Sequence, residues 1–416
     1  MKNKLRLVGF FTLCFLLTNC KEKKANTLAN SIKKINITKV FEKEEKLNLS
    51  KIAKSIEYIS LESNKDNILG RITKKNRDIQ IFENNILIKD KSFNLFLFNN
   101  KGGFKTRIGS MGKGPGEYTR IEEIIPIPNK GLIAAYSASQ QKVLMYNLEG
   151  EFEYSFKIDF WPLGLTYFNE NLIFFNLVGR RKLTDYYAMS IFNLKGELIK
   201  RLHYKEEEKK FEKNNTLRIK TRREEKFILN DTLRFWEGDY GKDIVYSLTK
   251  DLKIIPTYSV DFDDQLWTLD MYSESKKIGF EEMVKHSNIE RYFESSAYLF
   301  FSIAYAKKRK FFNVLYNKKT EEGHSVSYKR ENGKGLRFKF YNDIDGGMPF
   351  WPQGKVSDDK MYMIIHGYEL KDYLARKKKK DNPIIDELGR KKLLDIAENA
   401  KISDNPILMI VTLKND

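Results

Sequence analysis

Short runs of alternating apolar residues recur along the chain at a nearly constant interval. Three of them superimpose: LFLFNNKGGF from Leu95, VLMYNLEGEF from Val143 and MSIFNLKGEL from Met189. In each, a strand-like run is followed by Asn, two residues, Gly, one further residue and another apolar position. Asn and Gly adopt the positive φ angles that tight hairpin turns require, and a two-residue apolar period is typical of strands. The pattern therefore predicts β-hairpins whose turn glycines are 48 and 46 residues apart, namely Gly102, Gly150 and Gly196.

A second strand-like run precedes each hairpin, and looser copies of the hairpin follow. The preceding runs are ENNILIKD from Glu83, KGLIAAY from Lys130 and ENLIFFN from Glu170, and the later copies are DIVYSLTKDL from Asp243 and FFNVLYNKKT from Phe311. A unit of about 45 to 50 residues with four short strands is typical of a propeller blade. One blade for each of five hairpins, and one more closed by the chain ends, predicts six blades.

Two strong strands near the ends of the chain have no local partner. They are SIEYISLE from Ser55 and NPILMIVTLK from Asn405. Each would be an unpaired sheet edge unless the two join one blade and close the ring. We therefore expect an all-β fold, a six-bladed β-propeller of four-stranded antiparallel blades over residues 47–416.

Insertions lengthen some of the intervals. The charged run KEEEKKFEKNNTLRIKTRREEK from Lys205 predicts a solvated hairpin or loop. The stretch from Asp263 to about Glu294 has apolar residues at spacings compatible with one or two short helices, at Ile278, Met283, Val284, Ile289 and Phe293. ELKDYLARKKKK from Glu369 and LLDIAENA from Leu393 also look helical, and we expect them to form an excursion within the last blade.

The N-terminus has the pattern of an export signal. Residues 1–20 read MKNKLRLVGFFTLCFLLTNC, in which three cations precede an apolar stretch of eleven residues. Eleven residues span about 16 Å as a helix, whereas a bilayer core of about 30 Å needs roughly 20. The pattern therefore indicates a cleaved signal rather than a membrane-spanning helix.

The last four residues of this segment resemble the lipobox of bacterial lipoproteins, in which the cysteine becomes the acylated first residue. Asn19 stands where that motif usually has a small residue, and an ordinary secretory signal with an incidental Cys20 is the alternative. We expect export and anchoring of Cys20 to the cell envelope at the outer membrane, on its periplasmic or its outer side. Cys14 leaves with the signal, so disulfides and cysteine-based metal sites are excluded. Residues 21–46 are polar and predict a flexible tether.

The chain is strongly basic, with 75 Lys and Arg against 56 Asp and Glu and a net charge of +19. Such a charge commonly indicates nucleic acid or anionic membrane as a partner. An exported protein does not meet the chromosome, so we expect no nucleic-acid partner. The lysines are scattered, which favours a solvated surface, with anionic lipid or glycan as the specific alternatives.

Several runs resemble the six-bladed β-propeller lipoproteins, envelope proteins distantly similar to NHL-repeat propellers. The run RIGSMGKGPGEY from Arg107 to Tyr118 is close to their glycine-rich G-x-x-G-x-G-P-G-E-Y signature. SIEYISLE, DIVYSL, NDIDGGMPFWP and DNPILMIV add to the resemblance, which extends from about residue 55 to the C-terminus. It implies the fold and an envelope location, and no particular activity.

The glycine-rich run does not match the known phosphate-binding loops. Neither the Walker A spacing nor G-x-G-x-x-G is present, and Pro115 followed by Gly116 prevents a helix from starting there. We expect a structural loop between blades, although its amides could form an anion-binding nest flanked by Arg107 and Lys113. Together with the DIDGGMPFW loop, it supplies our candidate ligand-binding residues, which are Arg107, Lys113, Glu117, Tyr118, Asp343, Asp345 and Trp351.

Catalytic and metal-binding motifs are weak in this sequence. It has no G-x-S-x-G elbow, its four histidines lack paired spacing, and Asp343-Ile344-Asp345-Gly346 lacks the later ligands of a calcium loop, so we assign no catalytic residue and no metal ligand. Trp161, Trp267 and Trp351 lie beside loop signals and could stack on sugars.

We therefore expect a monomeric module that binds a glycan, a small molecule or a protein, without a cofactor. The alternative is a metal-dependent hydrolase or lyase, similar to lactonases, with a site and a calcium ion in the central channel. That analogy rests on the fold alone.

Overall fold

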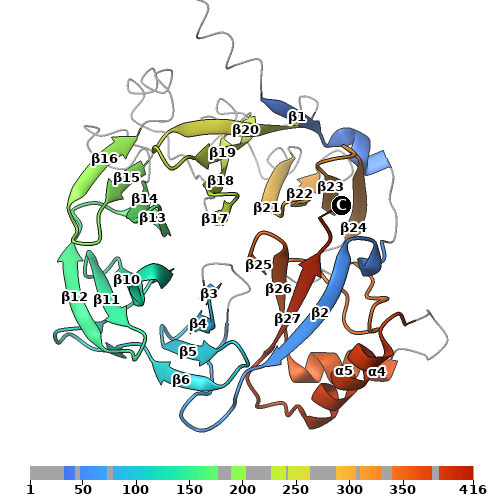
Figure 1. Cartoon of the computed structure of the whole chain (residues 1–416), viewed down its shortest axis with the longest axis horizontal. Coiled ribbons are helices and arrows are strands. Elements are labelled where there is room, and N and C mark those ends of the chain that lie inside the picture. The colour runs from blue at the N-terminus through green and yellow to red at the C-terminus, as the bar shows by residue number, and fades with distance from the viewer. Residues whose placement is uncertain are drawn as a thin grey trace, which may run out of the picture.

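Six sheets stand side by side around one axis and form a ring (Figure 1). The computed structural model describes residues 32–42, 47–72, 78–176, 189–202, 226–239, 242–262, 287–305, 310–328, 340–376 and 384–415. Each sheet contains four consecutive antiparallel strands, or their equivalent built from both chain ends. The predicted all-β, six-bladed propeller is therefore confirmed.

The first three blades follow the chain from the innermost strand to the outermost. Blade 1 contains β3 (Ile79–Phe82), β4 (Asn85–Lys89), β5 (Leu95–Asn99) and β6 (Phe104–Arg107). Blade 2 contains β9 (Glu123–Ile127), β10 (Leu132–Ser137), β11 (Lys142–Asn147) and β12 (Phe152–Lys157). Blade 3 contains β13 (Pro162–Phe168), β14 (Asn171–Asn176), β15 (Met189–Phe192) and β16 (Leu198–Leu202).

Blades 4 and 5 repeat this order. Blade 4 contains β17 (Lys226–Leu229), β18 (Thr232–Asp239), β19 (Lys242–Leu248) and β20 (Ile254–Asp261). Blade 5 contains β21 (Asn288–Glu294), β22 (Tyr298–Tyr305), β23 (Lys310–Asn317) and β24 (Gly323–Tyr328). The loose hairpin copies predicted from Asp243 and Phe311 are the third strands of these two blades, β19 and β23.

Blade 6 closes the ring with strands from both ends of the chain. Its order is β2 (Ala53–Ser60), β27 (Ile407–Leu413), β26 (Lys360–Ile365) and β25 (Gly354–Lys355). β2 and β27 pair antiparallel, with Ile59 opposite Leu408. The two strands that lacked a local partner therefore complete one blade, as predicted.

The apolar core lies between the blades. The described residues form six clusters of buried side chains, and each cluster joins two neighbouring blades. Along β5, Leu95 and Leu97 pack against blade 2, whereas Phe96 and Phe98 pack against blade 6. Successive side chains of a strand point to opposite faces, so a strand with neighbours on both faces is apolar at every position. This explains the uninterrupted LFLF run.

The hairpin glycines adopt a positive φ angle in the turn, and they allow the neighbouring blade to approach the turn closely. In blade 1 the Asn99 Oδ1 accepts hydrogen bonds from the Lys101 and Gly103 amides at 2.8 and 3.0 Å, and Gly102 has φ +87°. The preceding blade also approaches this turn closely, because a Cβ on Gly102 would lie 2.1 Å from the Ser60 carbonyl oxygen. The Glu62 amide donates to the Gly102 carbonyl at 2.8 Å, which ties blade 6 to blade 1.

The same contact recurs around the outer rim. A Cβ on Gly150 would lie 2.1 Å from the Arg107 carbonyl oxygen, and one on Gly196 would lie 2.4 Å from Phe156 Cγ. The Gly109 amide donates to the Gly150 carbonyl at 3.1 Å. Figure 1 shows the outer strands following one another around the ring, and these turns lie at their junctions.

The segment that we predicted as a tether is partly built into the ring. β1 (Lys33–Asn36) adds a fifth strand to blade 4 by parallel pairing with β20, and the 3-10 helix η1 (Thr38–Glu42) packs on β24 of blade 5. A second 3-10 helix, η2 (Leu49–Lys51), leads into β2. We call residues 32–42 and 47–52 the N-terminal belt.

The tether prediction is wrong for residues 32–42, because alternating apolar side chains of this segment are buried. Ile35 and Ile37 are fully buried, and the Phe41 ring lies 4.2 Å from that of Tyr305 and 4.6 Å from that of Phe312. The lysines between these positions hid the pattern in the sequence. Residues 21–31 and 43–46, like the signal segment, lie outside the described residues.

The predicted insertions have different outcomes. The helical excursion in blade 6 is confirmed as α4 (Gly367–Arg376) and α5 (Glu387–Asn399). The prediction of short helices from Asp263 to Glu294 is wrong at its end, because Ile289 and Phe293 lie in β21, where cross-strand pairing with β22 overrides the helical spacing. Residues 263–286, and the charged run from Lys205 up to residue 225, lie outside the described residues. No helix in the described part is long and apolar enough to span a bilayer.

Replacement of Gly150 by alanine tests the close approach at the rim. We expect the free energy of unfolding to fall by about 2 to 4 kcal/mol, because the new Cβ meets backbone atoms and φ is strained. Gly131→Ala is the matched control, since Gly131 has φ +61° but no atom within 4 Å of its Cβ position. It should lose only about 1 kcal/mol. Urea denaturation measures both, and equal losses would contradict the role of the contact.

Substitution of Phe41 by alanine tests the belt. We expect a loss of about 3 to 5 kcal/mol in unfolding free energy, as for a buried core aromatic. Lys39→Ala, an exposed position in the same 3-10 helix, should change stability by less than about 0.5 kcal/mol. If Phe41→Ala were as mild as Lys39→Ala in thermal and urea unfolding, the belt would be a tether after all.

Candidate functional site

The glycine-rich loop lies at the rim between blades 1 and 2. Two short parallel strands form it, β7 (Ser110–Met111) and β8 (Glu117–Tyr118). A Cβ on Gly109 would lie 2.7 Å from the Tyr146 ring, and one on Gly116 would lie 2.5 Å from the Phe152 ring. Glycine is therefore required because the loop backbone lies directly on two aromatic rings of blade 2.

A carboxylate from the loop itself occupies its backbone amides. The Gly114 amide donates to Glu117 Oε2 at 2.7 Å, and a Cβ on Gly112 would lie 1.9 Å from the same oxygen. An external anion at this position would have to displace Glu117. The anion-binding nest that we considered is therefore filled internally at Gly114.

The other candidates in this loop have different surroundings. Arg107 donates to the Asp66 carbonyl at 2.8 and 3.2 Å and lies over the Phe96 ring, so it holds the connection from blade 6 to blade 1. Tyr118 is buried, and burial raises the pKa of its phenol well above the usual range. Lys113 is exposed.

The second candidate loop belongs to blade 6 and does not meet the first. Asp343 accepts hydrogen bonds from the Ser50 amide and hydroxyl at 2.9 and 2.5 Å, so it fastens the belt. Asp345 accepts from Asn342 Nδ2 at 2.7 Å and from the Gly347 amide at 2.8 Å. Burial raises the pKa of the Asp345 carboxyl. The two carboxylates therefore serve separate internal partners.

Trp351 is also an internal residue. It is almost fully buried, its indole Nε1 donates to Ser302 Oγ at 3.1 Å, and its ring stacks on Phe340 with centroids 5.6 Å apart. Of the three tryptophans considered for sugar stacking, Trp267 lies outside the described residues and Trp161 is exposed. The structure thus separates the seven predicted ligand-binding residues, and only some of them reach the surface.

Buried ion pairs near the axis join the blades, and the sequence analysis did not find them. Lys89, at the end of β4, pairs with Asp78 at 2.9 Å and donates to the Glu122 carbonyl at 2.7 Å, which links blade 1 to blade 2. Glu123, the first residue of β9, pairs with Lys226, the first residue of β17, and so connects blades 2 and 4. The sequence feature that could have revealed these pairs is a lysine or glutamate at the end of an apolar strand.

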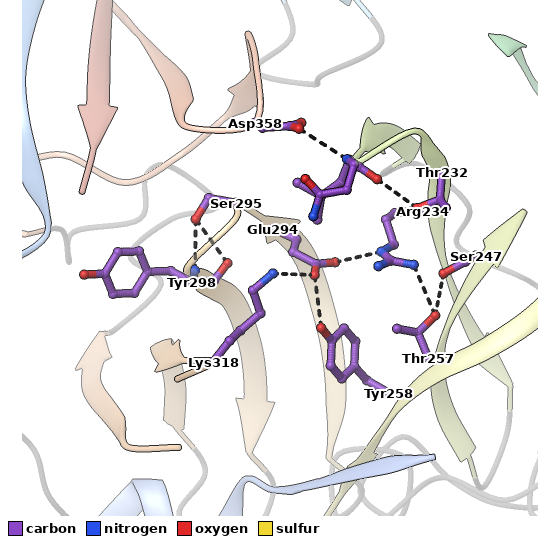
Figure 2. Close-up of polar contacts among 12 residues, drawn as sticks. Thr232, Arg234, Ser247, Thr257, Tyr258, Glu294, Ser295, Tyr298, Lys318 and Asp358 are labelled. Atoms are coloured by element: carbon purple, nitrogen blue, oxygen red, sulfur yellow. Dashed lines mark hydrogen bonds and ion pairs between the residues drawn. The ribbon is translucent and has the colours of Figure 1, made fainter. Parts of the chain in front are cut away.

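A second buried cluster joins blades 4 and 5 (Figure 2). Glu294, at the end of β21, is fully buried and accepts hydrogen bonds from Lys318 Nζ at 2.9 Å and from the Tyr258 hydroxyl at 3.3 Å. It also forms an ion pair with Arg234 Nε at 3.5 Å. The Tyr292 hydroxyl also donates to it. One carboxylate therefore contacts two cations and two phenols, and these four groups come from both blades. With these partners, the carboxylate is not available to bind an external ligand.

A further ion pair connects blade 6 to blade 4. Lys355 pairs with Asp358 at 2.9 Å and donates to the Ile228 carbonyl at 2.7 Å, while the Asn230 amide donates to Asp358 at 3.2 Å. Burial lowers the pKa of the Lys355 ammonium. These charges hold the ends of inner strands together near the axis.

The donor set near the axis does not fit the metal-dependent alternative. In the part of the chain that the structure describes, no three His, Cys, Asp or Glu side chains gather in a group that could hold an ion. The buried carboxylates Asp78, Glu123 and Glu294 each face a cation. The calcium hypothesis stays a prediction that these residues do not support, and His203 and His286 lie outside the described residues.

Four of the exposed large apolar side chains belong to blade 2 or to the connections on either side of it. Met111 and Trp161 lie in the connections before and after blade 2 and are 53% and 59% exposed, while Phe152 and Tyr154 on β12 are 39% and 36% exposed. We call these four residues the blade 2 rim. Tyr154 is held in place by a hydrogen bond to the Leu194 carbonyl at 3.1 Å. Of these four, only Trp161 was expected from the sequence, because the exposure of Phe152 and Tyr154 depends on the outermost position of β12 in its blade.

Comparison with solved structures supports the fold. A Bacteroides fragilis protein described as a "Putative exported protein" is 19% identical, with a TM-score of 0.67, covering 92% of this chain and 100% of its own. A member of the DUF4221 family from Bacteroides vulgatus is 11% identical, with a TM-score of 0.48, covering 87% of this chain and 97% of its own. The similarity to the Bacteroides fragilis protein shows the fold alone. No curated protein matches the chain.

A family model accounts for almost all of the described residues. The match extends over residues 32–412, from the start of the N-terminal belt to the last strand of the ring. Its starting point agrees with the structure, in which the belt is part of the propeller. The chain therefore belongs to the family described as "Domain of unknown function (DUF4934)".

Proposed function

We propose that this chain is an exported, lipid-anchored propeller that binds a partner through the blade 2 rim. The observation that carries this proposal is the exposure of Met111, Phe152, Tyr154 and Trp161. Large exposed apolar groups are costly in water, and aromatic residues and Met are enriched where proteins contact partners. The partner is a protein or a glycan, because aromatic rings present a flat apolar face to either.

Two further features support a binding role over a catalytic one. The buried charges near the axis are engaged in ion pairs that join blades, as at Glu294 and Lys355. Catalysis needs an acid, base or nucleophile that can reach a substrate. The blade 2 rim, in contrast, is accessible. Two of its four residues, Phe152 and Tyr154, lie on β12, which pairs with β11 along its length.

Export and lipid anchoring are supported by the N-terminal sequence. The apolar stretch ends at a lipobox-like Leu17-Thr18-Asn19-Cys20, and Ile32, which directly precedes the first strand of the belt, is only twelve residues further along the chain. A structural neighbour with the same fold is described as a "Putative exported protein". An acylated Cys20 would hold the ring close to the envelope membrane.

Replacement of Cys20 by serine tests the anchor. In cells fed an alkyne fatty acid, we expect the unchanged protein to take up label and to partition into the membrane and detergent phases. Cys20→Ser should lose the label and become soluble. Cys14→Ser is the matched control and should behave like the unchanged protein, because Cys14 lies in the apolar stretch. Retention of label by Cys20→Ser would refute the anchor.

Photo-crosslinking tests the blade 2 rim. Benzoylphenylalanine placed at Tyr154 or at Trp161 should give a discrete adduct with an envelope component on irradiation of intact cells. The control position is Ile402, which is 86% exposed in the segment before β27. A protein partner shifts the band on a gel, and a glycan partner leaves sugar fragments on the crosslinked peptide in mass spectra. Adducts of equal yield at all three positions, or none at 154 and 161, would contradict the proposal.

A further inference from the structure

Because β1 is part of blade 4, the chain between Cys20 and the ring is shorter than the tether that the sequence predicts. Ile32 directly precedes β1, on the outer edge of blade 4, and eleven residues separate it from Cys20. In any conformation the chain from Cys20 to Ile32 spans at most about 40 Å. An anchored Cys20 would therefore keep the rim of blades 4 and 5 near the membrane.

The N-terminal belt on this rim has more basic than acidic residues. The N-terminal belt contains four lysines and one acid, Glu42, among its described residues. Lys33 pairs with Glu321 on blade 5 at 2.7 Å. The other three, Lys34, Lys39 and Lys51, are exposed. Each lysine held close to an anionic lipid surface strengthens association by about fivefold.

We propose that the N-terminal belt docks the rim of blades 4 and 5 against an anionic phospholipid bilayer. This proposal rests on the proposed acylation of Cys20. The ring would then stand on its edge, with blades 1 and 2 away from the lipid. Figure 1 shows β1 and β6 on opposite sides of the ring. The glycine-rich loop and the blade 2 rim would face outward, where a partner can reach them.

Lysine footprinting on vesicles tests this orientation. The mature chain has Cys20 as its sole cysteine, so a maleimide lipid can attach the purified chain, produced from residue 20 onward, to vesicles through that thiol. Acetylation by an activated acetate ester is then followed at each lysine by mass spectrometry. We expect Lys34 and Lys39 to react at least about threefold more slowly on vesicles with anionic phosphatidylglycerol than in solution. The reason is that each lysine in contact with the anionic surface strengthens association by about fivefold.

Lys101 and Lys113 are the internal controls. Both are exposed, in the first hairpin turn and in the glycine-rich loop, and their reaction rates should not change. Uniform protection of all four lysines, or protection of Lys101 and Lys113, would overturn the orientation. Equal protection of Lys34 and Lys39 on zwitterionic phosphatidylcholine vesicles would overturn docking by charge.

A charge-reversed variant separates the belt from the anchor. On anionic vesicles we also expect slower acetylation of Lys51, the third exposed lysine of the belt. Lys34→Glu with Lys39→Glu should abolish this slower acetylation of Lys51, whereas Lys101→Glu with Lys113→Glu should not. Because the lipid is attached chemically, this result does not depend on processing in cells. Failure of the footprint with a labelled Cys20 in cells would overturn the docking alone, and an unlabelled Cys20 would overturn the anchor.

Discussion

The pairing of β2 with β27 is the contact on which the ring depends. Seven residues near the C-terminus pair with a strand more than 340 positions earlier, and this closes the gap between blades 5 and 1. Each blade buries both faces against its neighbours, so an open ring would expose two apolar faces at once. The register is also constrained, because a shift by one residue would move Ile59 from the blade 1 interface to the opposite face.

The outer and inner ends of the blades are joined by different chemistry. At the rim, glycine turns allow backbone atoms of consecutive blades to approach, as at Gly102 and Gly150. Near the axis, buried ion pairs such as those of Glu123 and Glu294 link blades. Buried pairs often add little net stability, but a partner left without its counter-charge is costly, so they favour one arrangement of blades.

The N-terminal belt connects the ring to the proposed anchor. It adds a strand to blade 4, packs Phe41 into blade 5 and leads into the outer strand of blade 6. Asp343, which looked like part of a calcium loop, instead holds Ser50 at the end of this belt. A force or a membrane contact at the N-terminus would therefore act directly on three of the six blades.

The sequence determined the blades, the hairpin turns and the helical excursion, because strand period and the φ preferences of Asn and Gly are local properties. It also determined ring closure, since two strong strands without neighbours had to pair. Only the tertiary structure decided that Asp345 and Trp351 are internal, that Glu294 holds two cations and that the blade 2 rim is exposed. Burial and pairing depend on which distant residues meet, as with Ser50 and Asp343, which are 293 positions apart, and no local pattern encodes that contact.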